Sequence, residues 1–267
     1  MTSTVHAELL ESAIAAARAA GELQLRRRGP GLKVEDKGAA DIITDVDRDC
    51  EQAVVELVAR RHPDHAMLAE EGTDTAGHSS PYLWIVDPLD GTKNYAHGYA
   101  RSCVSVAVAE RSQVVVGVVY NAAAGELFAA QAGRGATLDG APIHVSPIPR
   151  LSRAMVASAL AYDPTPGVRR ADRDQLERLA RVLAEAEAVR SDGCCALDLC
   201  DVARGRFDAY FEHRLKSWDT AAGTLIVREA GGTVTTYGGG PHDYSSPDML
   251  ASNGRFHAEL VALMAAP

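Results

Sequence analysis

The feature that most constrains this chain is an apolar run that ends in two acidic residues, within the segment Trp84–Tyr95. The run predicts a buried strand that delivers the carboxylates of Asp87 and Asp90 where the chain turns. The intervening proline fixes φ and removes a backbone N–H, while Gly91 allows the backbone to approach a ligand closely. If a helix starts at Thr92, the amides at its start form an anion site beside the acids.

Two further acidic spots favour a site at one edge of a sheet. Glu70 ends another predicted strand, and Asp219 follows Trp218 at the head of a predicted helix. Acids at strand ends and helix starts can converge in layered α/β folds. Phosphate and carboxylates repel each other unless cations lie between them, so the combination favours metal-assisted phosphate chemistry. The structural alternatives are a capped strand-to-helix turn, a surface acid at Glu70 and a helix N-cap at Asp219.

The hydrophobic pattern predicts an α/β or α+β fold in layers, with N-terminal and C-terminal lobes of about 1–150 and 151–267 within a single domain. Helices are expected over 9–28, 45–62 with Thr44 as its cap, 170–187, 195–203, 219–230 and from 255 onward. Strands are expected over 66–69, 82–86, 103–109, 114–120, 126–131, 155–158, 207–211 and 249–251, and the middle ones read as a meander.

Composition excludes several classes of protein. The chain has 27 basic and 36 acidic residues, a net charge of −9, and no long basic block, so direct nucleic-acid binding is not expected. No apolar stretch is long enough to span a membrane, and His6, Glu8 and Glu11 stand where a signal peptide needs its apolar core. The five cysteines form no C-x-x-C pair, which favours reduced thiols and a cytoplasmic location.

These motifs resemble those of the inositol monophosphatase family, which comprises magnesium-dependent, lithium-sensitive sugar and polyol phosphatases. The resemblance runs in the family's order from residue 37 to residue 232 and rests on Asp41–Thr44 with Asp47, Glu70–Gly72, Asp87–Tyr95, Gly193, Glu212 and Trp218–Gly223. It implies the five-layer αβαβα sugar-phosphatase fold and a homodimer.

The resemblance also implies a set of metal ligands. Glu70, Asp87 and the backbone carbonyl of Leu89 would bind a first ion. Asp87, Asp90 and Asp219 would bind a second, and Glu70 with waters would hold a third. All these ligands are oxygen, which suits Mg²⁺ or Mn²⁺ rather than zinc.

The catalytic roles follow from the same resemblance. A metal-activated water near Glu70 and Thr92 would attack phosphorus in line, with Thr92 linked to Asp47 as the activating relay. The amides of Gly91 and Thr92 would hold phosphate oxygens, and a water near Asp219 would protonate the leaving alkoxide. Lys37 matches a family lysine on a loop near the metals.

The implied substrate is myo-inositol monophosphate. Substrate contacts fall to Asp90, Gly91, Thr92, Gly193, Cys195, Glu212 and Asp219. The family usually shows Gly-Ser/Thr-Ala where this chain has Gly193–Cys195, and Ala100–Ser102 departs from the usual segment as well. These departures leave open related substrates, namely histidinol phosphate, 3′-phosphoadenosine 5′-phosphate and fructose 1,6-bisphosphate.

Two other interpretations are weighed against this one. The vicinal pair Cys194–Cys195 invites a redox or metal role, but adjacent cysteines bridge only through a strained ring, so small buried hydrophobic side chains are the default. Some bacterial family members act with the transcription machinery, and in this acidic chain such a role would run through protein partners. Loss of Glu70, Asp87, Asp90 or Asp219 would have favoured that binding role, and all four are present.

Overall fold

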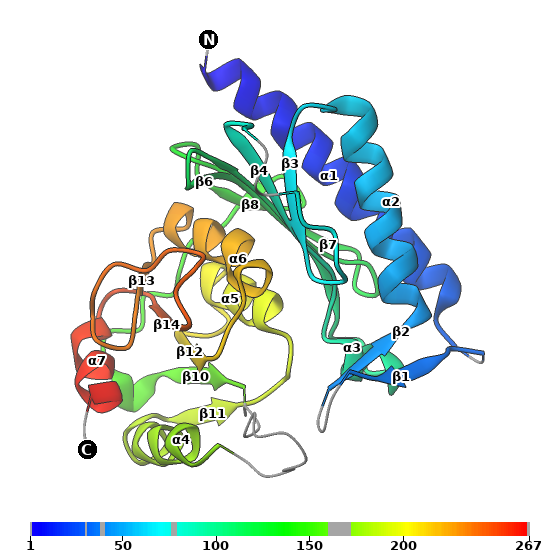
Figure 1. Ribbon diagram of the computed structural model, residues 1–267. Helices are drawn as coiled ribbons and strands as arrows, with labels where there is room; N and C mark the ends of the chain where they lie inside the picture. Colours follow the sequence, from blue (N-terminus) through cyan, green and yellow to red (C-terminus); the bar gives the residue numbers. More distant parts are fainter. Residues whose placement is uncertain (1, 30, 38–40, 76–78, 160–171, 266–267) are drawn as a thin grey trace.

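The computed structural model describes residues 2–29, 31–37, 41–75, 79–159 and 172–265 as alternating layers of helix and sheet (Figure 1). The first layer is a pair of long helices, α1 (Thr2–Arg27) and α2 (Asp45–Arg61). Thr44 caps α2 as predicted, since its hydroxyl accepts from the backbone N–H of Val46 at 3.2 Å and Asp47 completes the capping box. No helix in the described part of the chain is both long and apolar enough to cross a membrane.

The second layer is a seven-stranded sheet that carries the acidic motif. Its order is β3-β4-β5-β6-β7-β8-β9, in which β3 and β4 are parallel and the later strands form an antiparallel meander. The strands are β3 (Ala66–Ala69), β4 (Tyr82–Asp90), β5 (Cys103–Glu110), β6 (Gln113–Asn121), β7 (Glu126–Gln131), β8 (Ala136–Leu138) and β9 (Ala141–Pro142).

The third layer consists of α5 (Cys195–Ala203) and α6 (Ser217–Glu229), which lie between the two sheets in Figure 1. The fourth is a mixed five-stranded sheet of order β11-β10-β12-β14-β13. Its strands are β10 (Met155–Ser158), β11 (Ala188–Arg190), β12 (Ala209–His213), β13 (Thr233–Thr235) and β14 (Asp248–Ser252). Helices α4 (Arg173–Glu185) and α7 (His257–Ala265) form the outer layer, so the predicted mixed α/β fold in αβαβα layers is confirmed.

Burial on both faces explains why the central strands are apolar throughout. In β4, Trp84 and Val86 pack against α1 and α2, whereas Ile85 packs in the cluster that contains α5 and α6. In β5, Val104 and Val106 likewise belong to the cluster formed with α1 and α2, and Ala107 belongs to the cluster that contains α5 and α6. Side chains of a strand alternate between its two faces, so a sheet covered on both sides needs a continuous apolar run.

Several element boundaries differ from the sequence-based expectation. Helix α6 starts at Ser217, not at residue 219, because Lys216 is its N-cap and Asp219 lies in its first turn. Strand β4 continues to Asp90 instead of ending at residue 86. Helix α4 covers 173–185, and the predicted start at 170 lies outside the described residues. The short elements not predicted are β1 (Val34–Asp36), β2 (Ile42–Thr44), β8, β9, β11, β13 and the 3₁₀ turn Leu151–Arg153.

Candidate active site

A β-bulge at the end of β4 sets the positions of the two central carboxylates. Asp87 pairs with Ser105 and Asp90 pairs with Cys103, so β4 holds one more residue than β5 between these pairs. Pro88 lies in this interval, where a residue without an N–H interrupts no regular ladder. The carboxylate of Asp87 accepts a hydrogen bond from the backbone N–H of Leu89 at 2.9 Å.

The turn after the bulge requires glycine. Gly91 has a φ of +86°, and a Cβ at this position would lie 2.7 Å from the carbonyl oxygen of Arg101. The left-handed backbone and the close approach both exclude a side chain. The helix expected at Thr92 is present as α3 (Thr92–Ala96), a single short turn.

The carboxylates meet in a cleft of about 690 Å³ between the two sheets. Glu70 follows β3, and its backbone N–H donates to the carbonyl of Val86, which places it beside Asp87. Asp219 comes from the first turn of α6, and Glu212 comes from β12. The sequence-predicted residues that line this cleft are Lys37, Glu70, Asp87, Leu89, Asp90, Gly91, Thr92, Gly193, Cys195, Glu212 and Asp219. Asp47 is the one candidate that does not line it.

Asp47 lies behind the cleft wall and touches it through Thr92. The hydroxyl of Thr92 lies 3.0 Å from one carboxylate oxygen of Asp47 and 3.0 Å from the carbonyl oxygen of Leu89. The second oxygen of Asp47 accepts from the backbone N–H of Thr44 at 2.9 Å and from the Thr44 hydroxyl. Burial raises the pKa of Asp47, and these three donors oppose the rise. The site therefore contains a buried carboxylate connected to the cleft by one hydroxyl.

The four acids of the cleft strongly oppose one another's ionisation. Burial and the charges of Glu70, Asp90 and Asp219 raise the pKa of Asp87 well above its usual range. Burial, opposed by the neighbouring Lys37, raises the pKa of Glu70 to about 7. Burial also raises the pKa of Asp90, and that of Asp219 lies well above its ordinary value. The cleft thus has a large deficit of positive charge.

Lys37 supplies part of the missing positive charge. Its ammonium lies 3.2 Å from Glu70 and 2.7 Å from Glu71, and the side chain is 28% exposed. Glu51 accepts from the backbone N–H of Glu71 at 2.7 Å and thereby holds the segment that carries both acids. Sequence reasoning singled out the lysine but did not identify Glu51, because no local pattern connects α2 to this loop.

The opposite wall of the cleft carries one further carboxylate, that of Glu212 on β12. Glu212 accepts a hydrogen bond from the Tyr210 hydroxyl, and burial raises the pKa of Glu212 to about 8. Cys195, at the start of α5, is buried with 7% of its surface exposed. This wall offers hydrogen-bond acceptors at a distance from the acidic group around Asp87.

Two residues that were assigned no role connect the segment around α3 to helix α5 and to the loop before it. The side-chain amide of Asn94 donates to the carbonyls of Arg101 and Asp192 at 2.8 Å each. The guanidinium of Arg101 contacts Asp198 at 2.5 Å and Asp201 at 2.8 Å, both on α5. Both lie close to the acidic motif in sequence, but their partners Asp192, Asp198 and Asp201 are about a hundred positions away, so spacing could not reveal these contacts.

The donor set fits hard divalent cations. Glu70, Asp87, Asp90 and Asp219 offer carboxylate oxygens, and Leu89 offers a carbonyl oxygen, all on one cleft. Mg²⁺ and Mn²⁺ prefer such ligands. The raised pKa values of the four acids are the electrostatic signature of a site completed by cations. With cations bound, the cleft can hold a phosphate group between the acids and the Thr92 turn.

Comparison with known proteins agrees with this geometry. A model described as the inositol monophosphatase family matches residues 6–266. The chain is 42% identical over 258 residues to an inositol-1-monophosphatase of a Synechocystis species, covering 96% of this chain and 88% of the relative. It is 39% identical over 249 residues to the Nus factor SuhB of Vibrio cholerae, covering 92% of each. Its fold matches the crystal structure of the extragenic suppressor protein suhB from Bartonella henselae with a TM-score of 0.90 at 35% identity, over 97% of this chain and 98% of the other.

Proposed function

Because this chain belongs to the inositol monophosphatase family and is a phosphoric monoester hydrolase, we propose that it hydrolyses myo-inositol monophosphate with Mg²⁺ as cofactor. The observation that carries this proposal is the convergence of Glu70, Asp87, Asp90 and Asp219 on one cleft whose far wall holds Glu212. The first four form an anionic site for cations, and the fifth is placed to accept hydrogen bonds from a polyol.

We assign the cations to the ligands that the family resemblance implies. Glu70, Asp87 and the carbonyl of Leu89 would hold one ion, and Asp87, Asp90 and Asp219 would hold a second. Glu70 with waters would hold a third, weaker ion. When bound, magnesium acts as a Lewis acid that acidifies water and neutralises charge on the phosphoryl oxygens.

Thr92 and Asp47 then accept the proton of the attacking water through a chain of hydrogen bonds. The Thr92 hydroxyl accepts a hydrogen bond from that water and donates its own proton toward Asp47, whose carboxylate oxygen lies 3.0 Å away. The buried environment that raises the pKa of Asp47 makes it a better proton acceptor than an exposed aspartate. The backbone amides of Gly91 and Thr92 hold the phosphate.

The polyol is oriented by the opposite wall. Glu212 and Asp90 accept hydrogen bonds from ring hydroxyls, and Gly193 and Cys195 form the surface on which the ring rests. Cys195 is larger than the alanine usual in the family, so it narrows this part of the cleft. Asp219 holds the water that returns a proton to the leaving alkoxide.

The substrate assignment is tested by phosphate release from a panel of esters. Myo-inositol 1-phosphate, histidinol phosphate, 3′-phosphoadenosine 5′-phosphate and fructose 1,6-bisphosphate are each assayed with Mg²⁺, with EDTA and with added Li⁺. We expect lithium-sensitive release that is fastest from the inositol ester. Faster release from another ester would contradict the substrate assignment and leave the metal site in place.

A second candidate function rests on the relative from Vibrio cholerae, which is named a Nus factor. This chain, with a net charge of −9, would take that role by binding protein partners, not by binding nucleic acid directly. Copurification of transcription proteins with an Asp90→Asn variant, which lacks hydrolysis but keeps the surface, would favour it. We also expect a homodimer, which light scattering during size-exclusion chromatography checks directly.

A further inference from the structure

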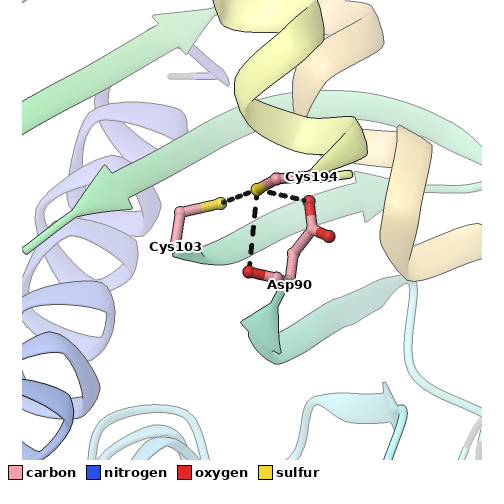
Figure 2. A group of neighbouring side chains, drawn as sticks. All are labelled: Asp90, Cys103 and Cys194. Atoms are coloured by element: carbon pink, nitrogen blue, oxygen red, sulfur yellow. Dashed lines mark hydrogen bonds between the residues drawn. The ribbon is translucent and has the colours of Figure 1, made fainter. Parts of the chain in front are cut away.

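Two buried thiols lie beside Asp90, next to the proposed magnesium site but not within it. Cys103 starts β5, and Cys194 is the N-cap residue of α5. The sulfur of Cys194 lies 3.7 Å from the sulfur of Cys103 and 3.2 Å from Oδ2 of Asp90 (Figure 2). The two cysteines are 0% and 1% exposed, and the three ligand atoms all lie within 4.8 Å of one another.

The two separations from the Cys194 sulfur are close to those of a tetrahedral thiolate site. With bonds of about 2.3 Å to sulfur and about 2.0 Å to oxygen, tetrahedral zinc separates two sulfur ligands by about 3.8 Å, and sulfur from oxygen by about 3.5 Å. The structure has 3.7 Å and 3.2 Å for the same pairs. The backbone carbonyl of Asp90 lies 3.6 Å from the sulfur of Cys194 and offers a fourth donor atom (Figure 2).

The surroundings favour the charge that such a complex carries. Two thiolates and one carboxylate around a divalent cation leave one net negative charge, after both thiol protons are released. The backbone N–H of Ala196, in the first turn of α5, donates to Oδ2 of Asp90 at 2.7 Å. The Arg101 guanidinium also favours the ionised form of Asp90. An amide and a cation that would repel a lone metal ion therefore stabilise the anionic complex.

We propose that Cys103, Cys194 and Asp90 form a binding site for a thiophilic divalent cation such as Zn²⁺, and that its occupation inhibits hydrolysis. Asp90 lines the catalytic cleft, so an ion reaches the thiols through this carboxylate. Figure 2 shows its second oxygen pointing away from both sulfurs, which leaves Asp90 shared between the thiol site and the magnesium site. A thiophilic ion on Oδ2 withdraws charge from the carboxylate and weakens its hold on Mg²⁺.

Direct binding tests the site without reference to catalysis. Metal-free, fully reduced protein is titrated with Cd²⁺, and thiolate-to-metal charge-transfer absorption in the near ultraviolet is recorded. We expect one equivalent to bind in the wild type and in Cys50→Ala, since Cys50 is a buried thiol in the α1–α2 layer. Cys194→Ser keeps a hydroxyl that can donate to Asp90 but lacks the thiolate, so its affinity should fall at least about 10-fold. Unchanged Cd²⁺ absorption in Cys194→Ser, or none in the wild type, would overturn the proposal.

Inhibition is tested separately at saturating Mg²⁺. Phosphate release is measured against increasing Zn²⁺, and each rate is normalised to the metal-matched rate of the same variant. The concentration that halves activity should rise at least about 10-fold in Cys194→Ser and in Cys103→Ala, and stay at the wild-type value in Cys50→Ala. Equal inhibition of all four proteins would refute an inhibitory role for the thiols. Because Cd²⁺ absorption needs no substrate, failure of the proposed hydrolysis of myo-inositol monophosphate would not be mistaken for failure of this site.

Discussion

The crowding of carboxylates in the cleft predicts that magnesium controls stability in a pH-dependent way. Burial raises the pKa of Glu70 from an ordinary 4.5 to about 7. A carboxyl whose pKa is higher in the folded state contributes stability that is complete below the unfolded value and is lost as pH rises through the folded value. Each pKa unit corresponds to about 1.4 kcal/mol, so ionising Glu70 alone costs about 3 kcal/mol by pH 8.

Thermal unfolding at pH 5 and pH 8, with EDTA or with Mg²⁺, measures this cost. For a chain of this size about 3 kcal/mol corresponds to roughly 6–12 °C in Tm. We expect the metal-free protein to lose at least that much between pH 5 and pH 8, and Mg²⁺ to restore most of it at pH 8 with little effect at pH 5. The reason is that cations replace the protons that the acids otherwise retain.

A matched pair of variants isolates the contribution of Glu70 to this pH dependence. Glu70→Gln should reduce the fall in Tm between the two pH values, because a neutral amide has no ionisation cost. Glu56→Gln, an exposed glutamate on α2, should leave it unchanged. An equal Tm at pH 5 and pH 8 in EDTA, or a magnesium effect of the same size in Glu70→Gln, would refute the electrostatic account.

Three further substitutions have defined expected outcomes. Gly91→Ala should lower the free energy of unfolding, measured by chemical denaturation, by at least about 1–2 kcal/mol and should also lower the rate of phosphate release. The reason is that φ is +86° and the new Cβ would lie 2.7 Å from the Arg101 carbonyl oxygen. A variant as stable as the wild type would contradict the turn geometry. Thr92→Val should lower kcat about 100-fold or more with little change in KM, and Thr92→Ser should recover most of it; equal losses in both would contradict the hydroxyl relay to Asp47. Arg101→Ala should lower unfolding free energy by about 3–5 kcal/mol, because it leaves the buried Asp198 unpaired, and adding Asp198→Ala should recover part of the loss. A double variant no better than Arg101→Ala would contradict the pairing.

Much of the fold could be predicted from the sequence because the central strands are long and apolar. Trp84–Val86 and the three runs after it form four neighbouring strands of one sheet, as the meander pattern predicts. Elements of three residues, such as β1 and β13, give no periodic signal and form only through their partner strands. The start of α6 was misplaced because Lys216 is not a preferred capping residue, and Asp219 acts from inside the first turn.

In the candidate site, too, residues adjacent in the chain could be predicted, whereas contacts between distant residues could not. The bulge residues could be found because Asp87, Pro88 and Gly91 are adjacent in the chain and each has a local physical meaning. The link between Asp47 and Thr92 spans 45 positions and was available only through the family resemblance. For the thiols, the vicinal pair Cys194–Cys195 drew attention in the sequence, whereas the close contact is between Cys194 and Cys103, 91 positions apart. The packing of the start of α5 against β5 brings those two sulfurs together.

The most direct test of the central claim is the magnesium dependence of phosphate release from myo-inositol 1-phosphate by the wild type and by Asp87→Asn. Asp87 is the carboxylate proposed to serve two cations, and the amide preserves its shape. We expect release by the wild type to saturate with Mg²⁺ and to stop in EDTA, and Asp87→Asn to lose at least about 100-fold in rate while remaining folded. Release that persists in EDTA, or that is unchanged in Asp87→Asn, would contradict it.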